Sequence, residues 1–127
     1  MVKILIVEDE RSIRQALRFE FEDLGYEVGF AADYEEAISA IRAFDYDLVI
    51  SDIYLNNGNA VQLLRQAYDD KKEVPYIAIT AFPGSDLSKC IRMILKDRFF
   101  EKPFCTTALR AKVDEILALR SAHALRN

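Results

Sequence analysis

Five short apolar segments recur along the chain, and a stretch with helical periodicity follows each of them. In the first, Ile4 to Val7 form four consecutive apolar residues, a run that predicts a strand buried on both faces. Buried strands of this kind are typical of parallel sheets. The predicted strands cover residues 2–7, 26–31, 48–51, 76–80 and 98–101.

Between the strands, apolar residues return every three or four positions, which is the spacing of one helix face. The predicted helices cover residues 11–24, 33–43, 60–68, a fourth segment that Pro83, Gly84 and Ser85 open, and 106–120. Gly25 is placed to end the first helix in a left-handed conformation. The residues expected to face inward are Ile13, Ala16, Leu17, Phe21 and Leu24 on the first helix, Ala37, Ile38 and Ile41 on the second, and Leu109, Val113, Ile116 and Leu117 on the last.

The alternation of strand and helix predicts an α/β fold, with a parallel sheet that helices cover on both sides. No linker, low-complexity tract or internal repeat interrupts the pattern. We therefore expect one domain over residues 1–120. Residues 121–127 form a weakly patterned tail, for which the end of the last helix, a linker remnant and disorder all stay open.

Size and composition are those of an ordinary globular protein, with 127 residues, 51% of them hydrophobic and 30% charged. A net charge of −4 argues against a nucleic-acid surface of its own. We expect no signal peptide, and no apolar run reaches the length that spans a bilayer. Cys90 and Cys105 form no CxxC pair, so we expect reduced thiols and a cytoplasmic protein.

Three acids, Glu8, Asp9 and Glu10, follow the first strand directly. Like charges at the end of an apolar strand repel one another and resist the loss of water, and a bound cation relieves that cost. Carboxylate oxygens favour a hard ion such as Mg²⁺. Alternatively, the acids only begin a helix, whose dipole favours negative charge there. The triplet alone leaves both interpretations open.

Polar side chains also stand at the ends of three further strands. Asp52 follows the third, Thr80 ends the fourth and Lys102 follows the fifth. Each alone has an ordinary explanation, since Asp often forms turns, Thr favours strands and Lys is common in exposed loops. Open parallel sheets bind ligands outside the carboxyl ends of their strands. The coincidence of these residues at one edge therefore indicates a common site.

This constellation resembles the receiver domain of two-component response regulators. The motifs that carry the resemblance are IVED at 6–9, DLVISD at 47–52, IAITA at 77–81 and EKPF at 101–104. They occur in order, one for each of four strands, and the resemblance covers residues 2–120. It implies a flavodoxin-like, doubly wound sheet of five parallel strands in the order 2-1-3-4-5, with five helices.

The resemblance implies that Asp52 is the phosphoacceptor and takes its phosphoryl group from a phosphohistidine. It also implies a Mg²⁺ or Mn²⁺ ion held by Asp9 and Asp52, by Glu8 through water, and by the backbone carbonyl of Tyr54. Lys102 would place a positive charge beside a phosphoryl oxygen. These roles match phosphoryl transfer, which depends mostly on positioning and charge neutralisation. Such a domain catalyses its own loading and decay but is not an enzyme for a metabolite.

Signal transmission is expected from Thr80 and Phe99. In the family, the hydroxyl at the end of the fourth strand moves to the new phosphoryl group, and an aromatic residue three positions before the lysine swings inward. Here that residue is Phe99, which lacks a hydroxyl, so we expect a bias towards the inward state without phosphate. A plain core role for Phe99 is the alternative. The family also implies a cis Lys102–Pro103 bond that aims the lysine.

Two loops depart from the family pattern. After Asp52 the usual proline and glycine are replaced by Asn56 and Ala60, so a more mobile loop or a helix start displaced by a residue or two is expected. Residues 95–98 replace the usual Gly-Ala turn, so we expect the fourth helix to be longer or to end differently.

Bulky side chains stand at the rim of the expected site. Tyr54 lies two positions after Asp52, and Phe82 lies two positions after Thr80, with Ala81 between them. Polar residues at these places can orient an attacking water, whereas apolar bulk hinders it. We therefore expect a long-lived phosphoryl group. The alternative is that both rings only cover the rim.

By resemblance, the partner is a sensor histidine kinase or a histidine phosphotransfer protein of a phosphorelay, docking on Arg11, Ser12, Arg14 and the loop 103–106. The output surface is formed by the fourth helix, the fifth strand and the fifth helix. A homodimer through it stays open, because Ala108 stands where a Glu is common in one subfamily. We expect no direct contact of this domain with nucleic acid or membrane.

Three other functions fit the fold class. A flavodoxin-type cofactor binder needs a hydroxyl- and glycine-rich phosphate loop after the first strand, where this chain has acids. A Mg²⁺-dependent phosphatase for free substrates needs an Asp-x-Asp arrangement and a cap domain. The leading alternative is a receiver that has lost phosphorylation and serves as an interaction module, although every chemical position is filled here.

Overall fold

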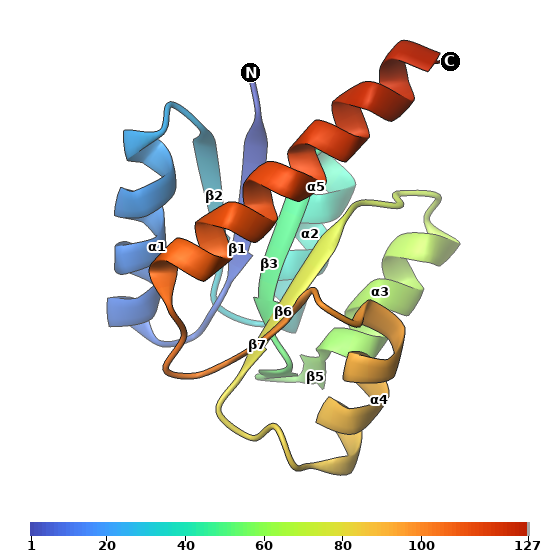
Figure 1. Cartoon of the computed structure of the whole chain (residues 1–127). Coiled ribbons are helices and arrows are strands. Elements are labelled where there is room, and N and C mark those ends of the chain that lie inside the picture. The colour runs from blue at the N-terminus through green and yellow to red at the C-terminus, as the bar shows by residue number, and fades with distance from the viewer. Residues whose placement is uncertain (127) are drawn as a thin grey trace.

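The structure is a computed structural model that describes the backbone of residues 1–126 and the side chains of residues 1–122. Within that part, one sheet of five parallel strands has the order β2–β1–β3–β6–β7 (Figure 1). This is the predicted order 2-1-3-4-5 once a separate two-stranded hairpin of β4 (Tyr54–Leu55) and β5 (Gly58–Asn59) is set aside. The sheet strands are β1 (Lys3–Val7), β2 (Glu27–Ala31), β3 (Leu48–Asp52), β6 (Tyr76–Thr80) and β7 (Phe99–Glu101).

Helices cover both faces of the sheet, as the alternating pattern predicts (Figure 1). α1 and α5 pack on one face, and α2, α3 and α4 pack on the other. The helices are α1 (Arg11–Asp23), α2 (Tyr34–Ala43), α3 (Ala60–Asp69), α4 (Asp86–Leu95) and α5 (Thr106–Arg126). The result is a three-layer α/β/α domain of flavodoxin-like topology.

Side chains of each central strand point alternately into two separate cores. In β1, Ile4 and Ile6 pack with residues of α1 and α5, whereas Leu5 and Val7 pack with residues of α2, α3 and α4. All four are fully buried. This two-sided packing fixes the register of each strand, and so it fixes where the residues that follow the strand lie.

Local sequence signals set several helix ends. Asp33 caps α2 and Ser85 caps α4, each by accepting a backbone N–H of the first turn. Asn59 and Gln62 form a capping box at the start of α3. Gly25 has φ +87° after α1, the left-handed conformation that was predicted from its position.

The inward face of α1 differs from the prediction at two positions. Ala16 is exposed and Leu24 is 37% exposed, so the prediction that both face inward is wrong. Leu17 and Phe21, four residues apart, form the buried stripe, and Ala16 lies about 100° around the helix from Leu17. Leu24 follows the last helical residue, where the chain turns towards Gly25.

Two segments contain more regular structure than the pattern predicts. The loop after β3 holds a small antiparallel hairpin of β4 (Tyr54–Leu55) and β5 (Gly58–Asn59), and α3 still begins at Ala60, as predicted. α5 continues to Arg126, six residues past its predicted end at residue 120. The two alanines and one leucine of this extension are good helix formers, so the helix continues where the alternation of apolar and polar residues is weak.

The end of α4 differs from the family pattern, as expected. The helix stops at Leu95, and Lys96 has φ +57°, a conformation that usually favours glycine. Its backbone N–H still closes the last turn on the carbonyl of Arg92 at 2.8 Å.

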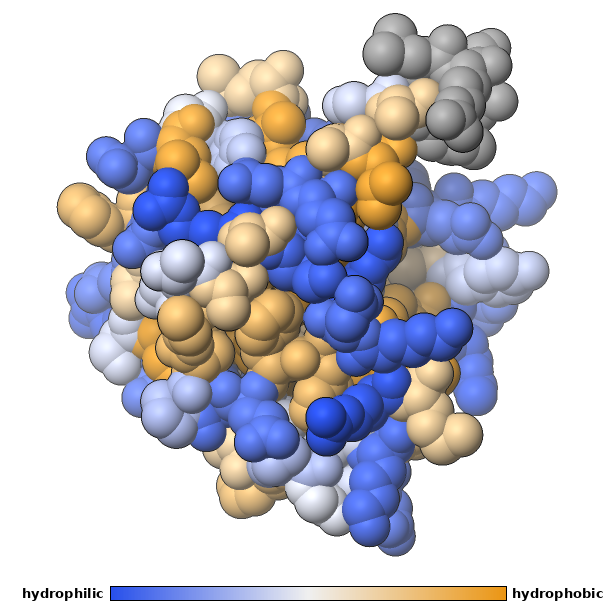
Figure 2. All heavy atoms as spheres, in the orientation of Figure 1, coloured by the Kyte–Doolittle hydropathy of each residue, from blue (hydrophilic) through white to orange (hydrophobic). Residues whose placement is uncertain are grey.

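The surface mixes polar and apolar residues. On the face in Figure 2, hydrophilic residues form a band over α5, and a group of apolar residues lies below that band. The longest helix, α5, has 21 residues, yet none of the helices in the described part of the chain combines length and hydropathy sufficient to cross a membrane.

Candidate functional site

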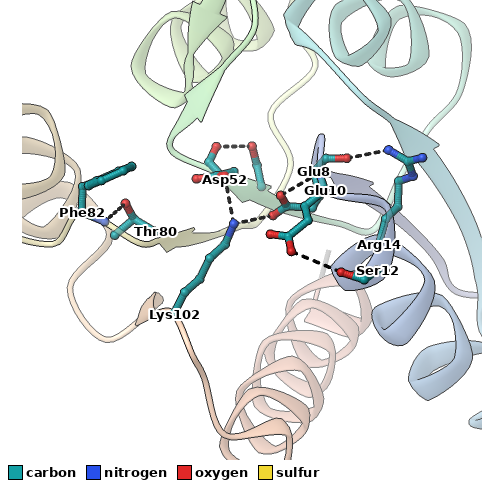
Figure 3. A network of polar contacts seen from close by, with 9 residues as sticks. Glu8, Glu10, Ser12, Arg14, Asp52, Thr80, Phe82 and Lys102 are labelled. Atoms are coloured by element: carbon teal, nitrogen blue, oxygen red, sulfur yellow. Dashed lines mark hydrogen bonds and ion pairs between the residues drawn. The ribbon is translucent and has the colours of Figure 1, made fainter.

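The strand ends bring the predicted site residues to one edge of the sheet, which lies at the bottom of Figure 1. β3 ends with Asp52 and β6 ends with Thr80, while Glu8 follows β1 and Lys102 follows β7. These strands are parallel neighbours in the sheet, so residues 22 to 94 positions apart in the sequence meet at this edge (Figure 3). The predicted convergence is therefore observed.

Lys102 reaches between two carboxylates from the segment after β7 (Figure 3). Its Nζ donates a hydrogen bond of 3.0 Å to Asp52 Oδ2 and lies 2.8 Å from Glu8 Oε2. The Lys102 and Asp52 side chains are each 13% exposed, and that of Glu8 is fully buried. Burial alone would lower the pKa of Lys102, but its close contacts with the Glu8 and Asp52 carboxylates outweigh burial and raise that pKa above its ordinary value. Lys102 is thus a fixed cation.

Glu8 is the least accessible acid of the site. Desolvation raises the pKa of its carboxyl group, and the charge of Asp52 raises it further, against the opposing effects of Lys102 and the Glu10 N–H. That N–H donates to Glu8 Oε1 at 3.1 Å. Among the described side chains, Glu8 Oε2 is one of two buried polar atoms without a well-directed hydrogen bond, although the Lys102 ammonium is close. This oxygen retains capacity to bind a further cation.

Three acids at this edge form a ligand set that fits a divalent metal ion. One carboxylate oxygen from each of Glu8, Asp9 and Asp52 lies within 4.8 Å of the others. When ionised, these three acids carry three negative charges, and the ammonium of Lys102 offsets one of them, which leaves two formal charges for a divalent ion to balance. Oxygen-only donors are the ligands that Mg²⁺ prefers. The interpretation of the acid triplet as a helix start alone does not account for the approach of Asp52.

Thr80 is fully buried at the end of β6, beside the acids. Its Oγ accepts the backbone N–H of Phe82 at 3.0 Å (Figure 3). The hydroxyl therefore holds the first residues of the β6–α4 loop in this structure.

The two rim residues, Tyr54 and Phe82, pack against each other. Their rings meet edge to face, with centroids 5.8 Å apart and an interplanar angle of 84°. Tyr54 is 39% exposed, Phe82 is 63% exposed and Ala81 between Thr80 and Phe82 is exposed. The Tyr54 hydroxyl donates a hydrogen bond to Ser85 Oγ. Aromatic side chains thus bridge the loop after Asp52 and the loop after Thr80.

Phe99 lies in β7 opposite Ala78, on the sheet face that α4 covers. It is half-buried against that core, and the guanidinium of Arg92 lies 5.3 Å from its ring centre. This packing gives Phe99 a structural role, and its role in switching stays a prediction.

One contact near the site was not anticipated from the sequence, and one backbone feature was. Arg14 was assigned only to a docking surface, but its Nη1 donates to the Glu8 carbonyl at 2.9 Å (Figure 3). A long cationic side chain one turn into the helix after an acid triplet is the signal for this contact. The Lys102–Pro103 peptide bond is cis, as predicted.

The comparisons with known proteins agree with this geometry. Residues 4–114 match the family described as response regulator receiver domain. The alkaline phosphatase synthesis transcriptional regulatory protein PhoP of Bacillus subtilis (strain 168) is 32% identical over 116 residues, which are 91% of this chain and 48% of PhoP. The chain therefore spans about half the length of this curated relative.

Two of the solved structures that share this fold illustrate the similarity. The response regulator TrrA of Thermotoga maritima, in complex with Mg(2+)-BeF, is 32% identical, with a TM-score of 0.75 and coverage of 91% of this chain and 99% of TrrA. A CheY-like response regulator receiver domain protein of Methanospirillum hungatei JF-1 is 25% identical, with a TM-score of 0.85 and coverage of 97% and 98%.

Proposed function

The chain belongs to the response regulator receiver-domain family, and on that premise we propose that Asp52 accepts a phosphoryl group from a phosphohistidine. Receiver domains of response regulators take phosphoryl groups from histidine kinases, and we propose such a kinase or a histidine phosphotransfer protein as the donor. The observation that carries the proposal is Lys102, which pairs with both Asp52 and Glu8. It places a fixed cation beside the nucleophile, at the edge where three acids can hold a metal ion.

In the proposed step, an Asp52 carboxylate oxygen attacks the phosphorus. A P–O bond forms, the P–N bond to the donor histidine breaks, and its electron pair stays on the imidazole. Lys102 can transfer its hydrogen bond from Asp52 Oδ2 to a phosphoryl oxygen while it keeps its ion pair with Glu8. Fixed positive charge at the transferred group is the main contribution that a protein makes to phosphoryl transfer.

Glu8, Asp9 and Asp52, with the backbone carbonyl of Tyr54, are the proposed ligands of Mg²⁺ or Mn²⁺. When bound, the ion supplies positive charge against the repulsion between the Asp52 carboxylate and the incoming phosphoryl group. The acid cluster supports this assignment, as does the related TrrA, whose structure is a complex with Mg(2+)-BeF. Asp9 is exposed, so it can be reached from solvent.

Thr80 and Phe99 are proposed to transmit the signal to the surface formed by α4, β7 and α5. Thr80 ends the strand beside Asp52, and Phe99 lies on the neighbouring strand, on the same sheet face. Amide spectra would test the bias of Phe99 towards the inward state: the free parent should show active-like shifts around α4, and Phe99→Tyr should show more inactive population. Inactive-like spectra of both proteins would contradict it.

The domain is proposed to work inside the cytoplasm and to turn over no metabolite. Its docking face for the donor is proposed to include Arg11, Ser12 and Arg14 on α1, of which Arg11 and Ser12 are exposed. A homodimer through α4, β7 and α5 stays an open proposal. No nucleic acid or membrane partner is proposed, given the net charge of −4.

Mass spectrometry after incubation with acetyl phosphate and Mg²⁺ tests the acceptor. We expect an adduct of about 80 Da, the mass of one phosphoryl group, in the parent and in Asp69→Ala, an exposed acid on α3. Asp52→Ala should show none. Absence of the adduct from the parent, with acetyl phosphate and with a cognate kinase, would favour a phosphorylation-independent interaction module.

A further inference from the structure

We propose that the Tyr54 hydroxyl acts as a latch that holds the start of α4 closed against the acceptor loop and thereby opposes phosphorylation of Asp52. The inference rests on the proposed function, because it concerns the same site. It assigns the hydroxyl of Tyr54, rather than its bulk, as the group that sets how readily the β6–α4 loop opens.

The latch joins two segments that are distant in sequence. Tyr54 lies in β4, two residues after Asp52, and Ser85 is the N-cap of α4, 31 residues later. Tyr54 Oη donates to Ser85 Oγ, and the Tyr54 ring packs edge to face on Phe82. One side chain therefore touches both ends of the loop between Thr80 and α4.

Ser85 is saturated in this arrangement. Its Oγ accepts from Tyr54 Oη and from the backbone N–H of Ser88 at 3.1 Å, and it donates to Ser88 Oγ at 2.9 Å. A hydroxyl has one donor and two acceptor sites, so all three are in use. Ser88 is fully buried, which holds Ser85 in place from the side of the core. The cap of α4 and the latch therefore share one oxygen.

The latch opposes a movement that phosphorylation requires of Thr80. In this structure, Thr80 Oγ accepts the Phe82 N–H, and Ser85 N–H donates to the Phe82 carbonyl at 3.2 Å. If Thr80 turns its hydroxyl towards a phosphoryl group on Asp52, the Phe82 N–H loses its acceptor. Phe82 and Ser85 must then shift together, and Tyr54 holds both. Opening the loop thus costs the Tyr54–Ser85 hydrogen bond and part of the ring contact.

Tyr54→Phe removes only the hydroxyl and keeps the ring on Phe82. A neutral hydrogen bond of this kind shifts an equilibrium by about five- to tenfold. We expect the amides of Phe82, Ser85 and Ser88 to exchange hydrogen about five- to tenfold faster in Tyr54→Phe than in the parent. The matched control is Tyr68→Phe, since Tyr68 is 68% exposed on α3 and should leave these amides unchanged.

The second measurement is the affinity for beryllofluoride in the presence of Mg²⁺. Tyr54→Phe should bind it several-fold more tightly than the parent, because the opposing hydrogen bond is gone. In a Ser85→Ala background, which lacks the acceptor, Tyr54→Phe should have no further effect on affinity.

Unchanged amide exchange in Tyr54→Phe, or unchanged or weaker beryllofluoride binding, would overturn the latch. The latch would also be overturned if Tyr54→Phe raised the affinity for beryllofluoride as much in the Ser85→Ala background as in the parent. Failure of the proposed function gives a different result, namely no beryllofluoride binding by the parent or any variant. The hydrogen-exchange comparison needs no phosphoryl group. It therefore tests whether the Tyr54 hydroxyl holds the loop closed even if Asp52 is not phosphorylated.

Discussion

At the scale of single residues, the site depends on a carboxylate that is costly to bury. Glu8 is fully buried, and its pKa is raised chiefly by desolvation. Lys102 offsets part of that cost, since its ammonium lies 2.8 Å from Glu8 Oε2, but the same ammonium also pairs with the Asp52 carboxylate. One cation shared between two acids leaves the site short of positive charge, which is the condition under which a divalent ion binds.

The raised pKa of Glu8 predicts a pH dependence of stability in the metal-free protein. The fold favours the protonated carboxyl, so the stability it contributes is fully present below about pH 4.5, the ordinary value, and is lost as pH rises through the raised pKa. Over that window, the free energy of unfolding of the parent should fall relative to that of Glu8→Gln, whose amide does not ionise. Urea unfolding with a chelator measures both.

Glu73→Gln is the matched control for this pH dependence, because Glu73 is exposed. Its stability profile should follow that of the parent. Parallel profiles of the parent and Glu8→Gln would show that burial of Glu8 does not govern the effect.

The aromatic rim predicts slow loss of the phosphoryl group from Asp52. Tyr54 and Phe82 pack on each other beside the acceptor and offer no carboxylate or amide to orient a water. The double variant Tyr54→Asn with Phe82→Glu should lose its phosphoryl group about tenfold faster or more, because a positioned polar group can assist the attacking water. Release after loading with acetyl phosphate is the measurement.

The matched control for phosphoryl loss is Tyr68→Asn with Phe44→Glu, two exposed rings at the ends of α3 and α2. This variant should keep the rate of the parent. Loss from the parent that is as fast as from the rim variant would mean that the rings only cover the rim.

At the scale of elements, both ends of α4 are fixed by specific local interactions. Ser85 caps its start and is shared with Tyr54, whereas its C-terminus closes on Lys96 in a left-handed conformation. A lysine in this conformation carries a steric cost that glycine avoids. Both ends of α4 thus carry a local constraint, close to the surface that is proposed to transmit the signal.

Lys96→Gly should stabilise the protein by about 0.5–1 kcal/mol, because relief of the strain exceeds the added entropy of the unfolded chain. Lys89→Gly, on the exposed side of α4, should destabilise it by about 1 kcal/mol, the ordinary cost of glycine within a helix. Urea unfolding of the two variants gives the comparison. Equal destabilisation by both substitutions would contradict strain at Lys96.

At the scale of the whole molecule, the site links three strands and so links ion binding to folding. Glu8, Asp52 and Lys102 follow or end strands that meet only in the folded sheet. An ion that binds this set and not the unfolded chain stabilises the whole domain by mass action.

Mg²⁺ should raise the free energy of unfolding of the parent by about 2.7 kcal/mol when the free ion is at about 100 times its Kd. Asp9→Asn should lose most of this gain, while its stability without metal changes little, since Asp9 is exposed. Asp69→Asn, an exposed acid on α3, should keep the full gain. Equal stabilisation of all three proteins would indicate that Mg²⁺ acts elsewhere.

Much of the fold follows from local patterns. The run from Ile4 to Val7 correctly predicted a buried strand. Asp33 and Ser85 marked the starts of helices, and Gly25 marked the end of one. These predictions succeed because each signal acts on the backbone within a few residues. The errors at Ala16 and Leu24 arose where helical periodicity is ambiguous at the edge of the buried stripe.

The sequence by itself determined which residues stand at the strand ends, and so which chemistry meets at the edge of the sheet. Apolar strands are buried, and they end where the chain reaches polar or charged residues, because burial of such groups is costly. Only the tertiary structure decided how those residues pair. The sharing of Lys102 between Glu8 and Asp52 and the bond from Tyr54 to Ser85 join positions 31 to 94 residues apart. Their geometry depends on the packing of strands and loops in three dimensions, which no local pattern along the chain encodes.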